Sequence, residues 1–147
     1  MTHFSAAIVW REEAGEIFFL LQDSKDNRKQ NSLIKTRFPG GMNKPPDEDP
    51  VTTLRREIKE ELWQELKESL PEAVHEDIND KDGHRHIFYL IPGGDLTGDL
   101  RQVEIVDGSD RLFPPRWVKS GEVGWYLYET HQLAFVRAMK RIGLMGR

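Results

Sequence analysis

The chain begins with two apolar stretches that have the length and composition of β-strands. Residues 3–10 and 16–22 are rich in β-branched, aliphatic and aromatic side chains, and a polar turn at Gly15 separates them. This pattern predicts an antiparallel hairpin. Residues 23–35 are polar and charged, so a loop is expected there. It leads to Pro39-Gly40-Gly41, where the two glycines permit backbone conformations that other residues resist.

Residues 50–69 have the spacing of an amphipathic helix. Asp49 suits the N-cap, and Pro50 suits the first helical position, where its missing N–H costs nothing. Apolar residues recur every four positions, and acidic residues lie on an adjacent face. The apolar set is Leu54, Ile58, Leu62 and Leu66, and the acidic set is Glu57, Glu60, Glu61 and Glu68. We therefore expect one side of this helix to pack and the other to present carboxylates.

The second half of the chain predicts one more hairpin, two weaker strands and a closing helix. Asp82-Gly83 is a strong turn signal between two strand-like segments. The order of elements indicates an α+β fold in which helices cover a mixed sheet, built as one domain over residues 1–147. The predicted elements are strands at 74–79, 84–91, 102–106 and 116–118 and a helix at 130–142.

Composition excludes several classes of protein. The chain has 147 residues, of which 37% are hydrophobic and 31% charged, which is typical of a globular domain with its own core. It has no cysteine, so disulfides and cysteine-ligated zinc are excluded. No apolar run approaches the roughly 18 residues that a membrane span needs, and the first residues lack the pattern of a signal peptide. We expect a cytoplasmic protein.

The net charge narrows the kind of ligand. A formal charge of -4 gives no general attraction for polyanions, which argues against a broad nucleic-acid surface. A phosphate-bearing ligand must then be captured by local groups or by metal ions.

Three glutamates stand within one turn of the predicted helix. Glu57, Glu60 and Glu61 occupy positions i, i+3 and i+4 and therefore share one side. Like charges at this spacing destabilise a helix by about 0.2–0.5 kcal/mol per pair, so the cluster needs either solvent or a cation. A solvated acidic face is the simpler interpretation. The alternative is a site for Mg²⁺, which prefers oxygen and is commonly shared between a few carboxylates and substrate phosphates.

The residues around these glutamates resemble the Nudix box, which reads Gly, five residues, Glu, seven residues, Arg-Glu, an aliphatic residue, any residue, Glu-Glu, any residue, Gly. The matching residues are Glu48, Arg56, Glu57, Ile58, Glu60 and Glu61. Two positions depart from the pattern. Six residues separate Gly41 from Glu48, and Trp63 stands where the family has glycine. We expect the helix to continue past Trp63 toward Ser69.

The resemblance implies a Nudix fold, with a mixed β-sheet between α-helices, and a metal-dependent hydrolase. Its reaction would cleave a pyrophosphate bond in a nucleoside diphosphate linked to another moiety, using Mg²⁺ or Mn²⁺. Arg56 would pair with Glu48 and hold the glycine loop against the helix. The implied metal ligands are Glu57, Glu60, Glu61 and the carbonyl of Gly40, and the expected substrate contacts are Arg37, Phe38 and Gly41.

The general base is left open at this stage. Glu60 and Glu61 are the candidates on the helix, and they are favoured over three acidic residues of a later loop. Those three are Glu104, Asp107 and Asp110.

The activity itself also has an alternative, a catalytically weak or inactive Nudix-fold module that binds or senses a nucleotide. The complete set of box carboxylates favours the enzyme. Residues 79–82 lack the Pro or Tyr that is typical of subgroups acting on ADP-ribose or dinucleoside polyphosphates, which weakens both substrate assignments. A homodimer is left open.

Overall fold

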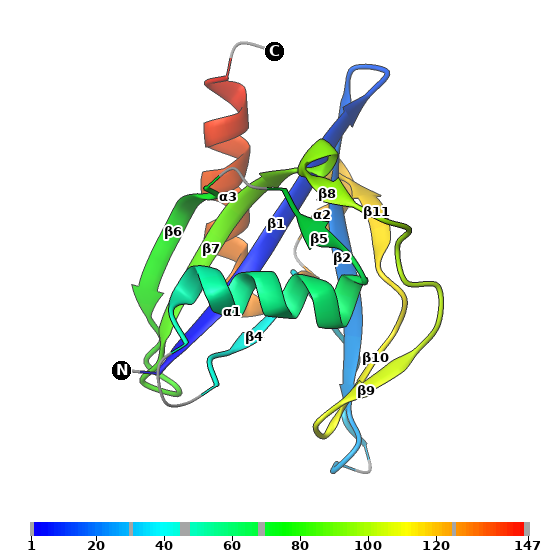
Figure 1. Ribbon diagram of the computed structural model, residues 1–147, viewed down its shortest axis with the longest axis vertical. Coiled ribbons are helices and arrows are strands. Elements are labelled where there is room, and N and C mark those ends of the chain that lie inside the picture. The colour runs from blue at the N-terminus through cyan, green and yellow to red at the C-terminus, as the bar shows by residue number, and fades with distance from the viewer. Residues whose placement is uncertain (1, 30, 45–47, 68–69, 125, 146–147) are drawn as a thin grey trace.

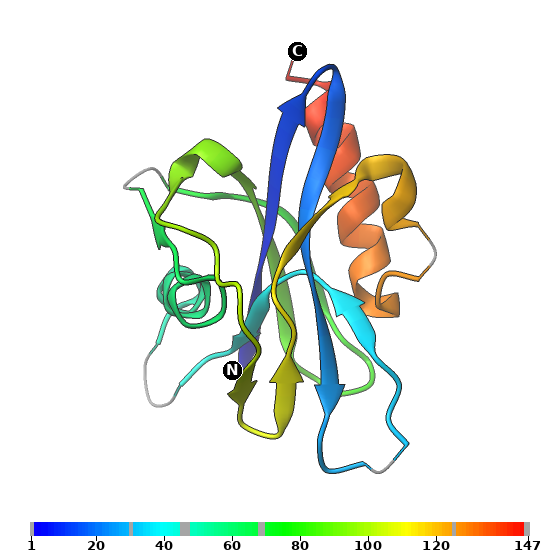
Figure 2. The same ribbon diagram turned by 90° about the vertical axis from the view of Figure 1, so that its right-hand side faces the viewer.

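A mixed β-sheet forms the centre of the molecule, and helices cover both of its faces. The computed structural model describes residues 2–29, 31–44, 48–67, 70–124 and 126–145. One helical layer crosses the front of the sheet in Figure 1, and the turned view of Figure 2 places the C-terminal helix on the opposite face. The predicted α+β architecture, a mixed sheet between helices, is confirmed. Among the described residues, no helix has both the length and the apolar character needed to cross a membrane.

The N-terminal hairpin is longer than the sequence pattern predicts. Strands β1 (His3–Glu13) and β2 (Glu16–Asp26) pair antiparallel, with Trp10 opposite Phe19. The prediction of a loop from residue 23 is wrong for residues 23–26. They stay in β2 because their backbones pair with strands that come later in the chain, and a local pattern of polar residues does not reveal such partners.

The remaining strands build outward from this hairpin. Strand β7 runs parallel to β1 and pairs antiparallel with β6, which confirms the second predicted hairpin. The sheet order is β6-β7-β1-β2-β10-β9, with β11 and β3 on β2 and β4 on β1. The predicted strand at 102–106 begins only at residue 105. The bounds are β3 (Lys35–Arg37), β4 (Gly40–Met42), β5 (Glu65–Leu66), β6 (Glu72–Ile78), β7 (Arg85–Pro92), β8 (Leu96–Thr97), β9 (Ile105–Asp107), β10 (Asp110–Leu112) and β11 (Arg116–Lys119).

The helix that carries the glutamates starts as predicted and ends early. The Asp49 side chain accepts a hydrogen bond from the Thr52 N–H at 2.8 Å, and α1 (Pro50–Glu57) continues as a π-helical turn, η1 (Ile58–Leu62). We call α1 and η1 together the acidic helix. It ends because Trp63 takes the left-handed conformation with φ of 59°, which glycine normally supplies at this position. The predicted continuation past Trp63 is therefore wrong; residues 65–66 form β5, and residues 68–69, with the predicted acidic position at 68, lie outside the described residues.

Two apolar layers fix the helices to the sheet. On one face the acidic helix buries Leu54, Ile58 and Leu62 against β1, β2 and β7, while the fourth predicted member, Leu66, lies in β5 at the edge of this cluster. The predicted C-terminal helix is α3 (Glu129–Gly143), which covers the other face. Short helices η2 (Gly93–Asp95) and α2 (Ser120–Val123) complete the fold. Because one side of the acidic helix is packed, its glutamates are held in fixed places.

Candidate active site

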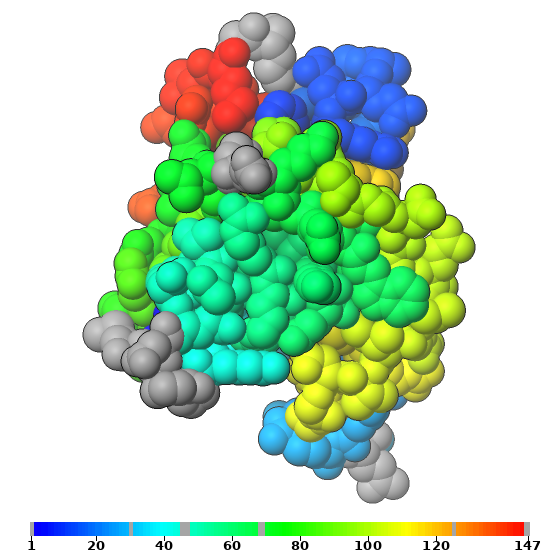
Figure 3. Space-filling model, in the orientation of Figure 1, coloured from blue at the N-terminus to red at the C-terminus, as the bar shows by residue number. Residues whose placement is uncertain are grey.

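Three carboxylates converge between the acidic helix and the β9–β10 hairpin. Glu57 and Glu61 lie one turn apart and are 5% and 1% exposed, and Asp107, at the end of β9, approaches them. One oxygen from each of the three side chains lies within 4.8 Å of the others. The helix and the hairpin lie side by side on one face in the space-filling view (Figure 3). We call Glu57, Glu61 and Asp107 the carboxylate cluster.

Strand β4 passes close to β1 at Gly40 and close to the carboxylate cluster at Gly41. A Cβ atom on Gly41 would overlap the carboxylate of Glu57, and one on Gly40 would overlap the backbone of Ser5 and Ala6. Neither glycine has a positive φ. The expected reason for the Gly-Gly pair, unusual backbone geometry, is therefore wrong, because close packing is what excludes a side chain.

Glu61 is buried in one fixed orientation. Its Oε1 accepts hydrogen bonds from the Gly40 N–H at 3.0 Å and from Nε2 of Gln22 at 2.8 Å, and its Oε2 lies 3.5 Å from Nη2 of Arg37. Burial raises the pKa of Glu61, and the charge of Arg37 opposes that rise. The two donors hold Oε1, so Oε2 is the oxygen left with fewer partners.

Glu57 carries an oxygen with no hydrogen-bond partner. Its Oε1 accepts from Nη1 of Arg56 at 2.8 Å, while the buried Oε2 has none. Burial, followed by the charge of Glu61, raises the pKa of Glu57 to about 7, and Arg56 acts in the opposite direction. An unsatisfied buried carboxylate oxygen beside further carboxylates fits a bound cation. The ligand atoms are all oxygen, which suits Mg²⁺ or Mn²⁺.

Arg56 joins the acidic helix to the loop before it. Its Nε and Nη2 donate to the two carboxylate oxygens of Glu48, each at 2.8 Å, and Nη2 also donates to the Met42 carbonyl at 2.8 Å. The predicted Arg56–Glu48 pair is confirmed as a bidentate ion pair, a strong and directional arrangement. The guanidinium lowers the pKa of Glu48 to about 2.

The other predicted acidic residues take different places. Glu60 lies at the rim, with its side chain 41% exposed, 3.2 Å from Arg56 and 3.6 Å from Lys44. A cleft of about 370 Å³ opens over the carboxylate cluster, and both Glu60 and Asp110 line it. Glu104 is paired instead with Arg111 at 2.8 Å on the exposed side of the hairpin. The structure therefore brings Asp107 to the cluster and leaves Glu60 beside it.

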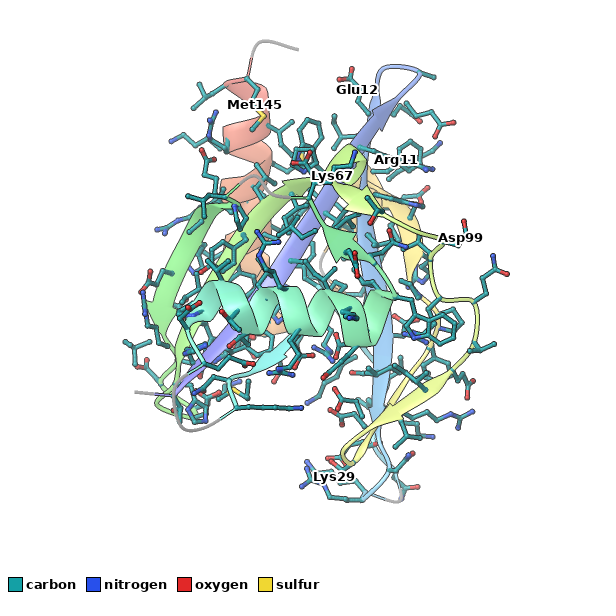
Figure 4. All side chains as sticks on the ribbon, viewed as in Figure 1. Arg11, Glu12, Lys29, Lys67, Asp99 and Met145 are labelled. Carbon is teal, nitrogen blue, oxygen red and sulfur yellow. The ribbon has the colours of Figure 1, made fainter. Side chains whose placement is uncertain are left out.

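Two of the three expected substrate contacts line a cleft, and the third is buried in the core. Arg37 and Gly41 line the cleft over the carboxylate cluster. A larger cleft of about 530 Å³ adjoins it, shares Arg37, and extends toward the loop that carries Lys29, at the end of the molecule farthest from Glu12 (Figure 4). Phe38 is fully buried and lines neither cleft; its ring stacks on that of His131, with centroids 5.8 Å apart. Its side chain therefore supports the site from the core.

Two buried polar residues near the cluster were not identified from the sequence. Gln22 is fully buried in β2, and Arg101 is 1% exposed. A glutamine after an apolar run marks a polar position in a buried strand, which is a weak signal. Arg101 stands in an irregular segment with no periodicity, so its burial could not be inferred.

The comparison with protein families decides the assignment. A family model described as the NUDIX domain matches residues 1–136. The chain belongs to the Nudix family. No curated protein sequence matches it. The fold is shared with several solved structures of low sequence identity, so they support the Nudix fold alone.

Three of these structures illustrate the likeness. The Escherichia coli ORF135 protein has a TM-score of 0.67 at 19% identity, covering 99% of this chain and 95% of that one. The Nudix domain of Shewanella oneidensis NrtR, solved with ADP-ribose, has a TM-score of 0.66 at 16% identity, covering 95% and 86%. A Caenorhabditis elegans Ap4A hydrolase has a TM-score of 0.57 at 15% identity, covering 97% and 98%.

The raised pKa of Glu57 predicts how the stability of the metal-free protein depends on pH. An unfolded chain releases this proton near pH 4.5, whereas the folded protein holds it to about pH 7. Between these values the folded state binds more protons, so the stability that Glu57 contributes is fully present below pH 4.5 and is lost as pH rises through 7. The loss is on the order of 3 kcal/mol at most. Thermal melts of Glu57→Gln should lack the part of the decline that this group causes, and an equal decline in both proteins would contradict the assignment.

The Arg56–Glu48 pair predicts non-additive effects on catalysis. Arg56→Ala should lower turnover about a hundredfold, because a small displacement of reacting groups has that effect. Glu48→Ala should resemble it, and the double variant should be little worse than either single one. Arg11→Ala serves as a control, because Arg11 pairs with Glu13 near the distant β1–β2 turn (Figure 4). Additive losses in a steady-state assay would show that Arg56 and Glu48 act separately.

Proposed function

We propose that this protein hydrolyses a pyrophosphate bond in a nucleoside diphosphate linked to another moiety, with Mg²⁺ or Mn²⁺ held by the carboxylate cluster. The observation that carries the proposal is the approach of the Glu57, Glu61 and Asp107 oxygens to within 4.8 Å, with a buried Glu57 oxygen that has no partner. Glu60 and Gly40 line the cleft beside the cluster, and the Gly40 carbonyl accepts a hydrogen bond from Nη1 of Arg37 at 3.1 Å. We propose the Glu60 carboxylate and the Gly40 carbonyl as further oxygen ligands. The setting we expect is the cytoplasm.

The cation would supply charge neutralisation at the diphosphate and a lowered pKa of bound water. The residues of the chain then bind and orient the substrate. Arg37 and Lys44 line the cleft and are placed to contact phosphate oxygens, which are anionic along the whole diphosphate. Arg56 keeps β4 and the acidic helix together, so that these contacts are in place before the substrate arrives.

The proton of the attacking water needs an acceptor within hydrogen-bond reach. Glu61, one of the two favoured candidates, is 1% exposed and already accepts two hydrogen bonds at Oε1. Glu60, the other, stands at the rim with its side chain 41% exposed. Asp107 is exposed at the end of β9. We propose Glu60 as the base and Asp107 as the competing candidate, since either accepts a proton without breaking the hydrogen bonds that position Glu61.

The nucleotide character of the substrate rests on the family and its neighbours. Solved structures of the same fold include an Ap4A hydrolase and a domain bound to ADP-ribose. The two adjoining clefts, of about 370 and 530 Å³, share Arg37, which suits a substrate with a diphosphate at the cluster and a larger group beside it. A binding module without hydrolysis remains the alternative, and it would not need three convergent carboxylates.

A substrate panel tests this proposal. Nucleoside triphosphates, dinucleoside polyphosphates and nucleoside diphosphate sugars are each incubated with Mg²⁺ or Mn²⁺, and both the phosphate released and the nucleotide products are identified. We expect hydrolysis of a P–O–P bond in one of these classes of substrate. Tight binding of a nucleotide without cleavage of any member would instead support the binding module.

A further inference from the structure

Arg101 is the largest side chain that is fully buried in the described structure, and it lies behind the carboxylate cluster. It comes from the segment that leads into β9, which passes beside the C-terminal end of the acidic helix in both ribbon views (Figures 1 and 2). Its backbone N–H donates to the Leu62 carbonyl at 3.3 Å. Burial of a cation costs free energy unless its N–H groups are hydrogen-bonded. The hydrogen-bond acceptors around this guanidinium therefore indicate its role.

The guanidinium connects three parts of the chain. Nε donates to the Glu61 carbonyl at 2.7 Å, at the end of the acidic helix. Nη2 donates to Oε1 of Gln22 in β2 at 2.9 Å and to the Phe113 carbonyl at 3.0 Å. Nη1 donates to the Val103 carbonyl and, at 3.3 Å, to the Leu112 carbonyl. All of these acceptors are neutral oxygens, so among the described residues no ion pair with the guanidinium accounts for its burial.

The contact with Gln22 fixes which oxygen of Glu61 is held. Arginine only donates hydrogen bonds, so it must face the Oε1 of Gln22, and Nε2 of the same amide must point the other way. That Nε2 donates to Oε1 of Glu61 at 2.8 Å. The relay from Arg101 through Gln22 therefore ties down one oxygen of Glu61 and leaves the other for the cluster.

The contacts with residues 103, 112 and 113 hold the other side of the cluster. They lie on both flanks of the β9–β10 hairpin, whose β9 carries Asp107. One side chain thus joins the Glu61 backbone, the Glu61 carboxylate and the base of the hairpin. Loss of its branched, planar geometry would let the two carboxylate-bearing segments move apart, and a lysine has a single nitrogen with which to replace it.

We propose that Arg101 is a positioning residue that sets the distance and orientation of Glu61 relative to Asp107, and so tunes the affinity of the carboxylate cluster for a divalent cation. This inference rests on the proposed function, since it takes the cluster to be the cation site. Residues that hydrogen-bond to metal ligands and orient them typically lower metal affinity by about 10- to 100-fold when they are mutated. We expect a loss of that size for Arg101→Lys.

The test measures Mn²⁺ affinity directly, by electron paramagnetic resonance at 25 °C, on wild type, Arg101→Lys and the control Arg111→Lys. Arg111 lies in the same hairpin but is exposed and paired with Glu104, so its variant should bind Mn²⁺ like wild type. Circular dichroism establishes that each protein is folded. A purely structural role would lower the melting temperature of Arg101→Lys and leave its Mn²⁺ affinity unchanged, and that result would overturn the proposal.

Two further variants keep the proposal testable. If Arg101→Lys does not fold, Gln22→Met breaks the relay while the guanidinium keeps its four carbonyl acceptors; it should also weaken Mn²⁺ binding, and full affinity would overturn the proposal. In an Asp107→Asn background, Arg101→Lys should cost less affinity than in wild type, whereas full additivity would contradict coupling through the hairpin. A wild-type protein that binds no Mn²⁺ would defeat the proposed function itself, and the inference with it.

Discussion

Replacement of Glu61 by glutamine should lower turnover by a factor of about 10² to 10⁴ while leaving the protein folded. The change keeps the size of the side chain. A glutamine oxygen still accepts from the Gly40 N–H and from Gln22, which meet Oε1 at 3.0 and 2.8 Å. What is removed is the negative charge, and an amide NH₂ group then faces the cluster where a cation would lie. Steady-state kinetics on the substrate identified by the panel measure the effect.

Stability separates this loss of charge from a loss of structure. Glu61 is buried and its ionised form is disfavoured, so the glutamine variant should melt at the same temperature as the metal-free wild type or above it. Glu60→Gln is the matched comparison, because Glu60 lies on the same helix, is 41% exposed at its side chain and stands outside the cluster. As the proposed base, Glu60 should lose at least as much turnover as Glu61 when it is changed to glutamine, and a smaller loss would favour Asp107 as the base. Wild-type turnover in both variants would contradict the catalytic roles proposed for Glu60 and Glu61.

The fold could be predicted from local patterns wherever one face of an element is buried. The β1–β2 hairpin and α3 follow from apolar patterns that the packed layers then satisfy, and the β6–β7 hairpin follows from its Asp82-Gly83 turn. The errors lie where distant partners decide. Residues 23–26 look like a loop, yet they remain in β2 because β3 and β10 pair with them. Trp63 ends the acidic helix although it is not glycine, by taking a left-handed conformation at a position where the residue is 52% exposed.

The candidate site was predictable in its chemistry and less so in its geometry. The motif gives the Arg56–Glu48 pair, and the structure contains it. Helical spacing alone places Glu57, Glu60 and Glu61 on one side, but only tertiary packing buries two of them and leaves Glu60 at the rim. Asp107 reaches the cluster through the β9–β10 turn, one of three loop positions that the sequence does not rank. Arg101 and Gln22 carry no motif at all, because their role depends on contacts across 79 positions of the chain.

Removal of divalent cations is the measurement that tests the central claim most directly. The carboxylate cluster has no means of placing positive charge against a diphosphate on its own, and three converging carboxylates would repel it. Exhaustive chelation should therefore abolish hydrolysis of the preferred substrate, and added Mg²⁺ or Mn²⁺ should restore it. Millimolar metal should also raise the melting temperature, because ligands that bind only the native state stabilise it. Undiminished turnover in the chelated protein would contradict the account.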